Sequence, residues 1–433
     1  MLAFVRVICI TAVRLYFREI SVSGEEVNDD ILSKNEGDNA IPVLIVANHP
    51  NGLLDPLVVQ LALKRKVRFL AKSTLFENIF GRTASLAFGA IPVYRTKDGQ
   101  DTSKNHSMFD AVYDAFKEKS WVVIFPEGVS HDLTTLLPLK TGAARMAIGA
   151  NLEELHILPI GITYDNKDQF RSRVNVNFGE ILEWSSLKGD EHVRELTESI
   201  SMGLKEAMFE TPSEDIRQGL FFVARWLEND APIAELEEKA KELESAYAKL
   251  LNRDPACAQE LTDDIRGFAR DLESVGLQPW NLEEKASIQG LAFLIIFSPI
   301  ALLGFLVHYP IYVLISIIVN RMAKSPGKGV PERDLLGTLK TLGALIFYPL
   351  GWIVLALLFT LLFNWKVGVL VGLSLIPLAL FTLRYTERFN RRRRALSRFW
   401  LSRVTPHLAT QIHQTRDQLM ERISKILTDE GSV

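Results

Sequence analysis

The stretch of sequence that decides the fold reads Ile41-Pro-Val-Leu-Ile-Val-Ala47 and continues as Asn48-His49-Pro50-Asn51-Gly52-Leu53-Leu54-Asp55. Its first part is a short apolar run rich in β-branched residues, which is typical of a strand buried on both faces. Asn51-Gly52 is a turn signal, and Asp55-Pro56 predicts a helix with an aspartate cap and a proline at its first position. His49 is therefore expected on a strand-to-helix turn beyond the carboxyl end of a core strand, where open α/β sheets bind ligands.

His49 and Asp55 together suggest general base chemistry. A neutral imidazole accepts a proton from a hydroxyl near pH 7, and a carboxylate on its other nitrogen fixes the tautomer and stabilises the imidazolium. Such a pair activates an alcohol. From these residues alone the alternative is equally open, namely that His49 is a polar turn residue and Asp55 only a helix cap.

Composition points toward a membrane. The 433 residues are enough for two or three domains. Hydrophobic residues make up 48% of the chain, and the mean hydropathy of +0.11 is high for a soluble protein. The net charge of −3 does not indicate nucleic acid. The two cysteines, Cys9 and Cys257, are far apart and offer neither a disulfide framework nor a metal spacing.

Residues 1–20 are predicted to form an amphipathic helix with Arg6, Arg14 and Arg18 on one face. We expect it to lie in the membrane interface. An ordinary packed helix is the alternative, and a signal peptide is disfavoured because the arginines interrupt its apolar region. Residues 21–40 are polar and predicted to be a loop.

Residues 41–210 are predicted to form an α/β catalytic domain with a largely parallel sheet, because strand and helix patterns alternate there. The strand candidates are 41–47, 67–71, 90–94, 121–125, 157–163 and 173–178. The helical patterns fall at 56–64, 74–87, 106–119 and 138–150.

Polar residues follow several of these strands. Arg95 offers a planar set of donors suited to phosphate. Glu127, in Phe125-Pro-Glu-Gly128, needs a partner if it is buried, and we expect Arg95 or a substrate hydroxyl. Lys140 precedes a helix whose free amides suit an anion. Each residue alone has a commoner explanation as a surface cation or a capping group.

Taken in order, these segments resemble the four-block pattern of the glycerolipid (PlsC-type) acyltransferase superfamily over about residues 41–182. The blocks are Asn48-His49…Asp55, Gly89…Arg95, Phe125-Pro-Glu-Gly128 and Leu158-Pro-Ile-Gly161. Five residues, not the common four, separate His49 from Asp55, and the third block continues as Val129-Ser-His-Asp132. With Leu136-Leu-Pro-Leu-Lys-Thr-Gly142, these variants are similar to the fungal glycerol-3-phosphate/dihydroxyacetone-phosphate acyltransferase branch.

The resemblance implies transfer of a fatty acyl group from a CoA or carrier-protein thioester to a glycerol hydroxyl, without a metal or a further cofactor. His49 is then the general base and Asp55 its orienting partner. The phosphorylated acceptor is held by Arg95, Glu127 and Gly128. The substrate-binding residues also include Asn48, His131 or Lys140 in place of an arginine missing after Gly128, and Pro159, whose block shapes an apolar wall.

Glycerol 3-phosphate or dihydroxyacetone phosphate is the expected acceptor, and 1-acylglycerol 3-phosphate (lysophosphatidate) is the second choice. A non-catalytic membrane protein that binds or remodels lipid is the alternative of another class, against which the His49/Asp55 pair argues. A transporter is disfavoured because the apolar segments carry almost no ionisable residues. The oligomeric state is left open.

Residues 211–285 are predicted to form a charged helical hairpin with coiled-coil-like seams, divided at Asn252-Arg-Asp-Pro255. Intramolecular packing is favoured over a dimer coil, with partner binding as the alternative. The seam positions are Leu236, Ala240, Leu243, Tyr247 and Leu250 in the first helix and Leu261, Ile265, Phe268, Leu272 and Val275 in the second.

Residues 286–384 are predicted to be a membrane region, followed by a basic amphipathic tail at 385–433 that is interrupted at Pro406. The apolar segments are 291–319, 341–363 and 367–383. Basic residues gather at 321–340 and at Arg391–Arg394. The positive-inside bias favours a re-entrant pair at 291–319, broken around Gly304 to Pro310, and a catalytic domain that faces the cytoplasm of a bacterial inner membrane or an endoplasmic reticulum.

Overall fold

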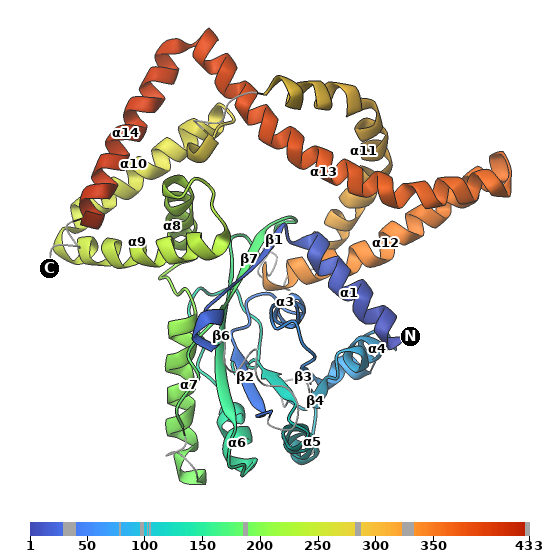
Figure 1. Ribbon diagram of the computed structural model, residues 1–433, viewed down its shortest axis with the longest axis vertical. Helices are drawn as coiled ribbons and strands as arrows, with labels where there is room; N and C mark the ends of the chain where they lie inside the picture. The colour runs from blue at the N-terminus through green and yellow to red at the C-terminus, as the bar shows by residue number, and fades with distance from the viewer. Residues whose placement is uncertain are drawn as a thin grey trace. The chain divides into compact units, whose positions relative to one another are not determined.

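The chain divides into two compact units (Figure 1). The α/β unit comprises residues 1–217, 232–237 and 323–341, and the helical unit comprises residues 218–231, 238–322 and 342–433. The computed structural model describes residues 1–28, 40–77, 79–95, 99–101, 103, 105–184, 189–281, 287–322 and 333–428.

A seven-stranded sheet forms the centre of the α/β unit. Across the sheet the strands are β1 (Glu19–Ser23), β7 (Arg173–Phe178), β6 (His156–Tyr164), β2 (Val43–Ala47), β5 (Trp121–Ile124), β3 (Arg68–Lys72) and β4 (Ile91–Val93). All neighbours pair in parallel except β6 and β7, which are antiparallel. The predicted α/β fold with a largely parallel sheet is confirmed, and each of the six predicted strands is present.

Strand β1 is the one that the sequence did not predict, and the expected loop at 21–40 is wrong for residues 21–23. β1 lies at the edge of the sheet, is half-buried along its length and pairs with β7, as in Ile20 with Val174. A strand whose partner is so distant in sequence leaves no local turn signal. Residues 29–39 of the predicted loop lie outside the described residues.

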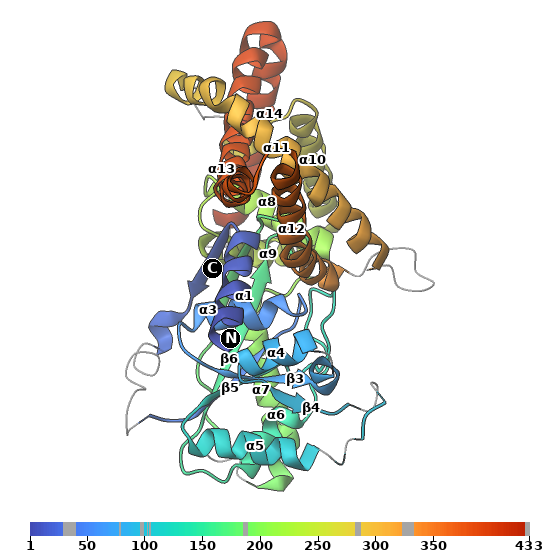
Figure 2. The same ribbon diagram turned by 90° about the vertical axis from the view of Figure 1, so that its right-hand side faces the viewer.

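Helices cover both faces of the sheet, and Figure 2 allows them to be followed from the side. One face packs against α1 (Leu2–Tyr16) and α3 (Leu54–Ala62). The other packs against α5 (Asn105–Lys117), α6 (Gly142–Gly149) and α7 (Val193–Ala207). The predicted helix at 74–87 is a 3₁₀ turn, Ser73–Phe76, followed by α4 (Ile79–Ala87). Two further 3₁₀ turns are Glu25–Asn28 and Asp190–His192.

Strand β2 anchors the unit because it is buried on both faces, as its apolar sequence predicted. Val43, Ile45 and Ala47 pack toward α1 and α3, whereas Leu44 and Val46 pack toward α5 and α6. Each of these residues is fully buried. Burying a valine, leucine or isoleucine side chain contributes about 1.5–3 kcal/mol, so the strand that precedes His49 has little freedom to move.

Helix α1 is packed on the α/β unit along part of its length. Val13 and Tyr16 are buried in the core, and the helix contacts α3 and α4. These contacts support the alternative of an ordinary packed helix for this half. Leu2, Phe4 and Val7 near its start are exposed, so the interfacial role of that end stays a prediction.

The charged helices of the middle region do not form the predicted coiled-coil-like hairpin. Helix α9 (Ile233–Arg253) is followed by α10 (Pro255–Ser274), which Asp254 caps at the predicted division. The two helices stay in contact near that turn, where the Thr262 hydroxyl donates to the Tyr247 hydroxyl at 3.4 Å. Beyond it they diverge (Figure 1), and α10 packs against α14 (Pro406–Thr428) and, through Phe268, against α8 (Glu214–Leu227). The apolar repeats were correct, but repeats of two heptads do not specify which helix covers them. A short 3₁₀ turn, Pro279–Asn281, follows.

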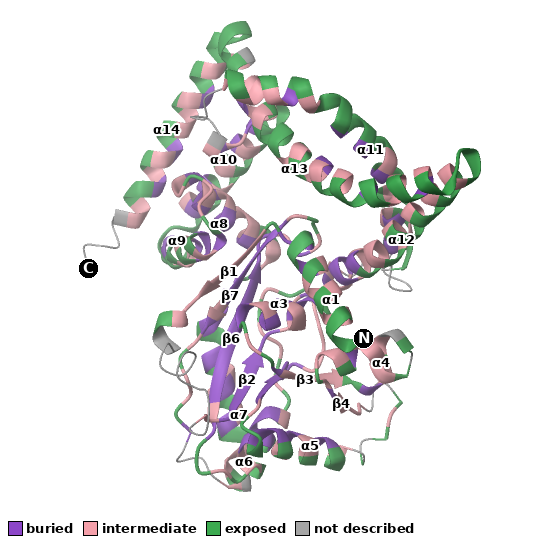
Figure 3. Ribbon diagram, turned by 45° about the vertical axis from the view of Figure 1, so that its right-hand side comes forward, coloured by how far each residue is buried: buried purple, intermediate pink, exposed green. Residues whose placement is uncertain are grey.

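Three helices are long and apolar enough to cross a membrane: α11 (Ile288–Met322), α12 (Arg333–Leu362) and α13 (Trp365–Val404). Figure 3 shows them mostly exposed, unlike the buried strands β2 and β6. Helix α13 runs unbroken past the predicted tail boundary at 385 and ends just before Pro406. Helix α12 begins eight residues before the predicted 341. Of the predicted basic loop, residues 323–332 lie outside the described residues.

The predicted break around Gly304 to Pro310 is wrong. Helix α11 is continuous through this region, although Pro299 and Pro310 lie inside it. Proline leaves the carbonyl four residues earlier without a donor. For Pro299 that carbonyl is on Ile295, and the Ser298 hydroxyl donates to it at 2.9 Å. Figure 1 shows a curved helix. Prolines therefore bend this segment and do not end it.

Candidate active site

His49 lies where the sequence placed it, on the turn between β2 and α3. Its ring stacks on that of Phe125, with 4.2 Å between centroids. Phe125 follows β5, which pairs in parallel with β2. The two loops therefore leave the sheet at the same edge, the carboxyl ends of the central strands, as the prediction required.

His49 and Asp55 form the predicted pair. The distance from His49 Nδ1 to Asp55 Oδ2 is 2.8 Å, and Asp55 is fully buried. A carboxylate can only accept, so Nδ1 carries the proton and Nε2 keeps a free lone pair. Within the part of the chain that the structure describes, Nε2 has no hydrogen-bond partner, and the histidine side chain is 19% exposed. This nitrogen is free to accept a proton from a substrate.

Asp55 is not the helix cap that its position suggested. Helix α3 begins at Leu54, its cap residue is Leu53, and no side chain caps it. The Asp55 carboxylate instead accepts from three donors: His49, the Asn51 backbone N–H at 2.7 Å and the Tyr164 hydroxyl at 2.6 Å. Asp55 is therefore not a helix cap, and its carboxylate is held beside the His49 ring.

Tyr164 is a member of the site that the sequence did not reveal. It ends β6, which pairs with β2, so its position at the end of a neighbouring strand was the signal. Burial, reinforced by the charge of Asp55, raises the pKa of Tyr164 well above its ordinary value. The phenol therefore stays protonated and donates to Asp55 throughout the neutral range.

Glu127 organises the loops around His49. Its fully buried carboxylate accepts from the backbone N–H of His49 at 2.9 Å and from that of Leu137 at 3.0 Å, and it also binds the His131 ring. The expected partners, Arg95 or a substrate hydroxyl, are replaced by these protein groups. A carboxylate so occupied favours a structural role over direct contact with the acceptor.

His131 is similarly occupied. Its ring Nε2 faces Glu127, and its ring Nδ1 accepts from the Leu133 backbone N–H at 3.2 Å. The His131 backbone N–H donates to the His49 carbonyl at 3.2 Å. Both ring nitrogens are used within the protein. The expectation that His131 replaces a missing phosphate ligand therefore finds no support in its contacts.

Arg95, Gly128 and Lys140 do come together. The Arg95 guanidinium donates to the Gly128 carbonyl at 2.8 Å. Gly128 has a φ of +73°, a left-handed conformation that favours glycine, and the Lys140 side chain passes beside it. The Lys140 backbone N–H donates to the Pro126 carbonyl at 2.8 Å, and its side chain is exposed. Two cations thus flank the turn after β5, as phosphate binding would require.

Asn48 and Pro159 have structural contacts in place of the substrate contacts that the resemblance implied. The buried Asn48 amide extends the β2–β6 ladder, donating to the Ile162 carbonyl at 3.1 Å and accepting from its N–H at 2.7 Å. Pro159 is buried inside β6 on the face toward α7, close to Gly203. Because side chains alternate along a strand, that is the face opposite the Asp55–Tyr164 contact.

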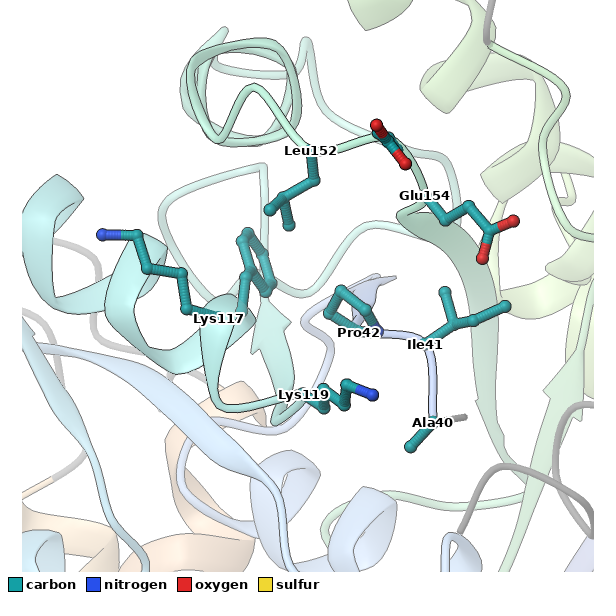
Figure 4. A pocket seen from close by; sticks show the side chains of 9 residues that line it. Ala40, Ile41, Pro42, Lys117, Lys119, Leu152 and Glu154 are labelled. Atoms are coloured by element: carbon teal, nitrogen blue, oxygen red, sulfur yellow. The ribbon is translucent and has the colours of Figure 1, made fainter. Parts of the chain in front are cut away.

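The α/β unit also contains a hollow of about 580 Å³, and Figure 4 draws the side chains that line it. Ala40, Ile41 and Pro42, which precede β2, line it together with charged residues such as Lys117 and Glu154. It lies at the amino end of β2 and not beside His49. Among the described residues, no group of three or more His, Cys, Asp or Glu side chains is arranged to hold a metal ion.

Comparison with known proteins shows which families the chain resembles. The family model described as Acyltransferase matches residues 19–163. Two Saccharomyces cerevisiae proteins, Glycerol-3-phosphate O-acyltransferase 2 and 1, are each 27% identical to the chain, over 288 and 363 residues. The matches cover 60% of this chain and 38% of the first protein, and 75% of this chain and 47% of the second. The chain therefore spans less than half the length of either relative.

Among solved structures, the crystal structure of the 1-acyl-sn-glycerophosphate (LPA) acyltransferase PlsC from Thermotoga maritima is 17% identical. It covers 47% of this chain and 78% of its own, with a TM-score of 0.35. The matched region, residues 19–163, contains His49, Asp55, Arg95 and Glu127. Through this region, the chain is similar to acyltransferases, and the yeast relatives support a resemblance to the fungal glycerol-3-phosphate acyltransferase branch of the glycerolipid acyltransferase superfamily.

Proposed function

We propose that the chain transfers a fatty acyl group from a thioester to a hydroxyl of glycerol 3-phosphate or dihydroxyacetone phosphate. The observation that carries this proposal is the His49–Asp55 pair, with Nδ1 held by a buried carboxylate and Nε2 open. The names of the two yeast relatives support glycerol 3-phosphate as the acceptor. The donor is acyl-CoA or an acyl carrier protein, used as a co-substrate.

The proposed reaction needs one base and good positioning. His49 Nε2 takes the proton of the acceptor hydroxyl while the hydroxyl oxygen attacks the thioester carbonyl carbon. The C–O bond forms, the C–S bond of the resulting tetrahedral intermediate breaks, and the imidazolium returns its proton to the leaving thiolate. Asp55 stabilises the imidazolium between these steps. Such base assistance typically contributes about 10²–10⁴-fold.

Arg95 and Lys140 are the proposed ligands of the acceptor's phosphate. Both flank Gly128, and Gly128 follows Phe125, on which the His49 ring stacks. A phosphate bound there brings the glycerol hydroxyl toward Nε2. Guanidinium and ammonium groups are both common phosphate ligands.

The membrane topology is a further part of the proposal. Residues 1–217 and 333–341 precede and follow α11 in sequence, yet they pack in one unit. Arg333, for example, is 3.2 Å from Asp168. A single crossing by α11 would place these stretches on opposite sides of the bilayer, so we infer that both ends of α11 lie on the side of the α/β unit.

Contacts inside the helical unit support the same re-entrant path. Near the start of α11, the Tyr385 hydroxyl of α13 donates to the Leu294 carbonyl at 2.8 Å. Near the end of α11, Ile315 lies against Gly343 of α12. Tyr385 and Gly343 are at similar distances in sequence from Asn364, the turn of the α12–α13 hairpin. The two ends of α11 therefore contact the hairpin at similar levels.

The middle of α11 reaches further toward the hairpin turn, where His308 contacts Trp352 and Ile311 lies against Gly351. These contacts still stop well short of Asn364. A continuous, curved α11 thus enters part of the bilayer and returns. The basic residues at 321–340 and at Arg391–Arg394 are then on the side of the α/β unit, which the positive-inside bias assigns to the cytoplasm.

The test of the proposed activity is an assay of the purified chain in phospholipid vesicles. Acyl-CoA and acyl carrier protein would be offered as donors, and glycerol 3-phosphate, dihydroxyacetone phosphate and lysophosphatidate as acceptors, with products identified by mass spectrometry. We expect a monoacylated glycerol 3-phosphate or dihydroxyacetone phosphate. Phosphatidate formed from lysophosphatidate alone would contradict the acceptor, and no product from any pair would contradict the activity.

A further inference from the structure

The first turns of α12 lie against the loop that carries the catalytic pair, although they are almost 300 residues away in sequence. The Thr338 hydroxyl accepts from the backbone N–H of Leu53 at 3.0 Å and lies 3.5 Å from the Asn51 carbonyl. Asn51 and Leu53 are two of the five residues between His49 and Asp55. The Asn51 backbone N–H donates to the Asp55 carboxylate. Thr338 therefore fixes the loop backbone whose N–H binds that carboxylate.

Two glycines allow this approach. A side chain at Gly337 would meet Asn51 Oδ1 at 2.8 Å and the Lys167 carbonyl at 3.0 Å. A side chain at Gly52, whose φ is +49°, would meet Thr338 Oγ1 at 3.0 Å. Loop and helix therefore approach closely at these two glycines, and the Thr338 hydroxyl joins them. The glycine of the turn signal in the opening stretch thus serves the contact with α12 as well as the turn.

Asp334 connects the same helix to the second catalytic loop. Its buried carboxylate accepts from the Ser130 hydroxyl at 2.7 Å. Ser130 lies between Glu127, which binds the His49 N–H, and His131, which binds the His49 carbonyl. Asp334 also lies in the first turn of α12, where a negative charge is stabilised by the helix dipole.

Charged groups fix the edge of this contact. The Arg333 guanidinium binds the Asp168 carboxylate at 3.2 and 3.3 Å, and the Lys340 ammonium donates to the Asp168 carbonyl at 2.6 Å. The three residues Asp334, Gly337 and Thr338 are spaced at helical intervals, and all are buried. One face of the start of α12 is therefore built to pack on the α/β unit.

We propose that Asp334 and Thr338 are positioning residues, through which the start of α12 holds the His49–Asp55 loop and the Glu127 loop in their reactive arrangement. This inference rests on the proposed acyl transfer. The acyltransferase domain matched at residues 19–163 is then completed by a segment that lies at the start of a candidate membrane helix.

The test compares two isosteric substitutions one helical turn apart, Thr338→Val and Thr341→Val. Among the described residues, the Thr341 hydroxyl bonds only to the Gly337 carbonyl of its own helix, at 2.9 Å. Thr341→Val therefore controls for the loss of a threonine hydroxyl from this helix. In the full chain in vesicles, Thr338→Val should lower kcat about 10- to 100-fold, with the KM values for both substrates within about twofold. Thr338→Ser should restore kcat, and Thr341→Val should match the wild type.

A second measurement does not depend on turnover. In protein labelled with ¹³C-histidine, with His49→Ala to identify the resonance, Thr338→Val should shift the His49 ring signal, and Thr341→Val should not. Equal kcat and equal His49 signals in the two valine variants would overturn the inference. An inactive wild type whose His49 signal still responds to Thr338→Val would instead count against the proposed function.

Discussion

At the scale of single residues, the site is a buried chain of hydrogen bonds that ends at one open nitrogen. Tyr164 and Asn51 hold Asp55, Asp55 holds His49 Nδ1, and Nε2 faces outward. Buried polar groups of this kind are costly when they lose a partner. Each link can therefore be tested by a substitution that removes one donor.

Tyr164→Phe removes the hydroxyl that donates to Asp55. A hydrogen bond to a charged group contributes about 1.5–3 kcal/mol, so we expect kcat to fall about tenfold. Because burial raises the pKa of Tyr164, the phenol stays protonated, and the ratio of wild-type to variant kcat should be constant from pH 6 to 9. Steady-state assays across that range would measure the ratio. A ratio that changed with pH would show that Tyr164 itself exchanges a proton.

Glu127→Gln separates a structural role from acceptor binding. The amide keeps one acceptor but presents a donor toward the His49 or Leu137 N–H, which costs about 1–3 kcal/mol. We expect a lower Tm and a lower kcat, with the KM for glycerol 3-phosphate changed no more than that for acyl-CoA. A selective rise in the acceptor KM would show that Glu127 contacts the acceptor.

Arg95→Ala, in contrast, should raise mainly the KM for the acceptor, because Arg95 is a proposed ligand of its phosphate. The same steady-state assay would measure the KM values for acceptor and donor.

At the scale of elements, the sequence predicted most of what local patterns control. Apolar runs and the turn and helix-start residues that follow them predicted six strands, the turn at Asn51-Gly52 and the placement of the His49–Asp55 pair. It missed β1, because that edge strand depends on a distant partner. It did not reveal the backbone contacts of Asn48 and His131, because a polar side chain bound to backbone is indistinguishable in sequence from one bound to substrate. The sequence also gave no sign that the start of α12 contacts this site, because Leu53 and Thr338 are almost 300 residues apart.

The path of α11 is the clearest test at this scale. In a background in which Cys9 and Cys257 are replaced, a cysteine in place of Lys328 should react with an impermeant thiol reagent only from the side of the α/β unit. A cysteine in place of Asn364 should react only from the other side, because in the proposed topology the α12–α13 hairpin alone crosses the bilayer. Labelling of the two positions from the same side would rule out the proposed topology.

At the scale of the whole molecule, the chain combines an acyltransferase domain with three apolar helices. The large exposed apolar side chains of these helices, such as Ile296, Leu306 and Leu373, are what a lipid environment would cover. We therefore expect the purified chain to lose activity when its phospholipid is removed by detergent and to regain it on reconstitution into vesicles. Specific activity before and after reconstitution would measure this dependence.

The central claim, that His49 is the base of an acyl transfer, is tested most directly by comparing His49→Ala with His106→Ala. His106 lies exposed at the start of α5, so its replacement controls for the loss of a histidine. In vesicles with acyl-CoA and glycerol 3-phosphate, kcat should fall about 10²–10⁴-fold in His49→Ala and stay at the wild-type value in His106→Ala, with similar Tm values for both. Near-normal turnover by folded His49→Ala would contradict the account.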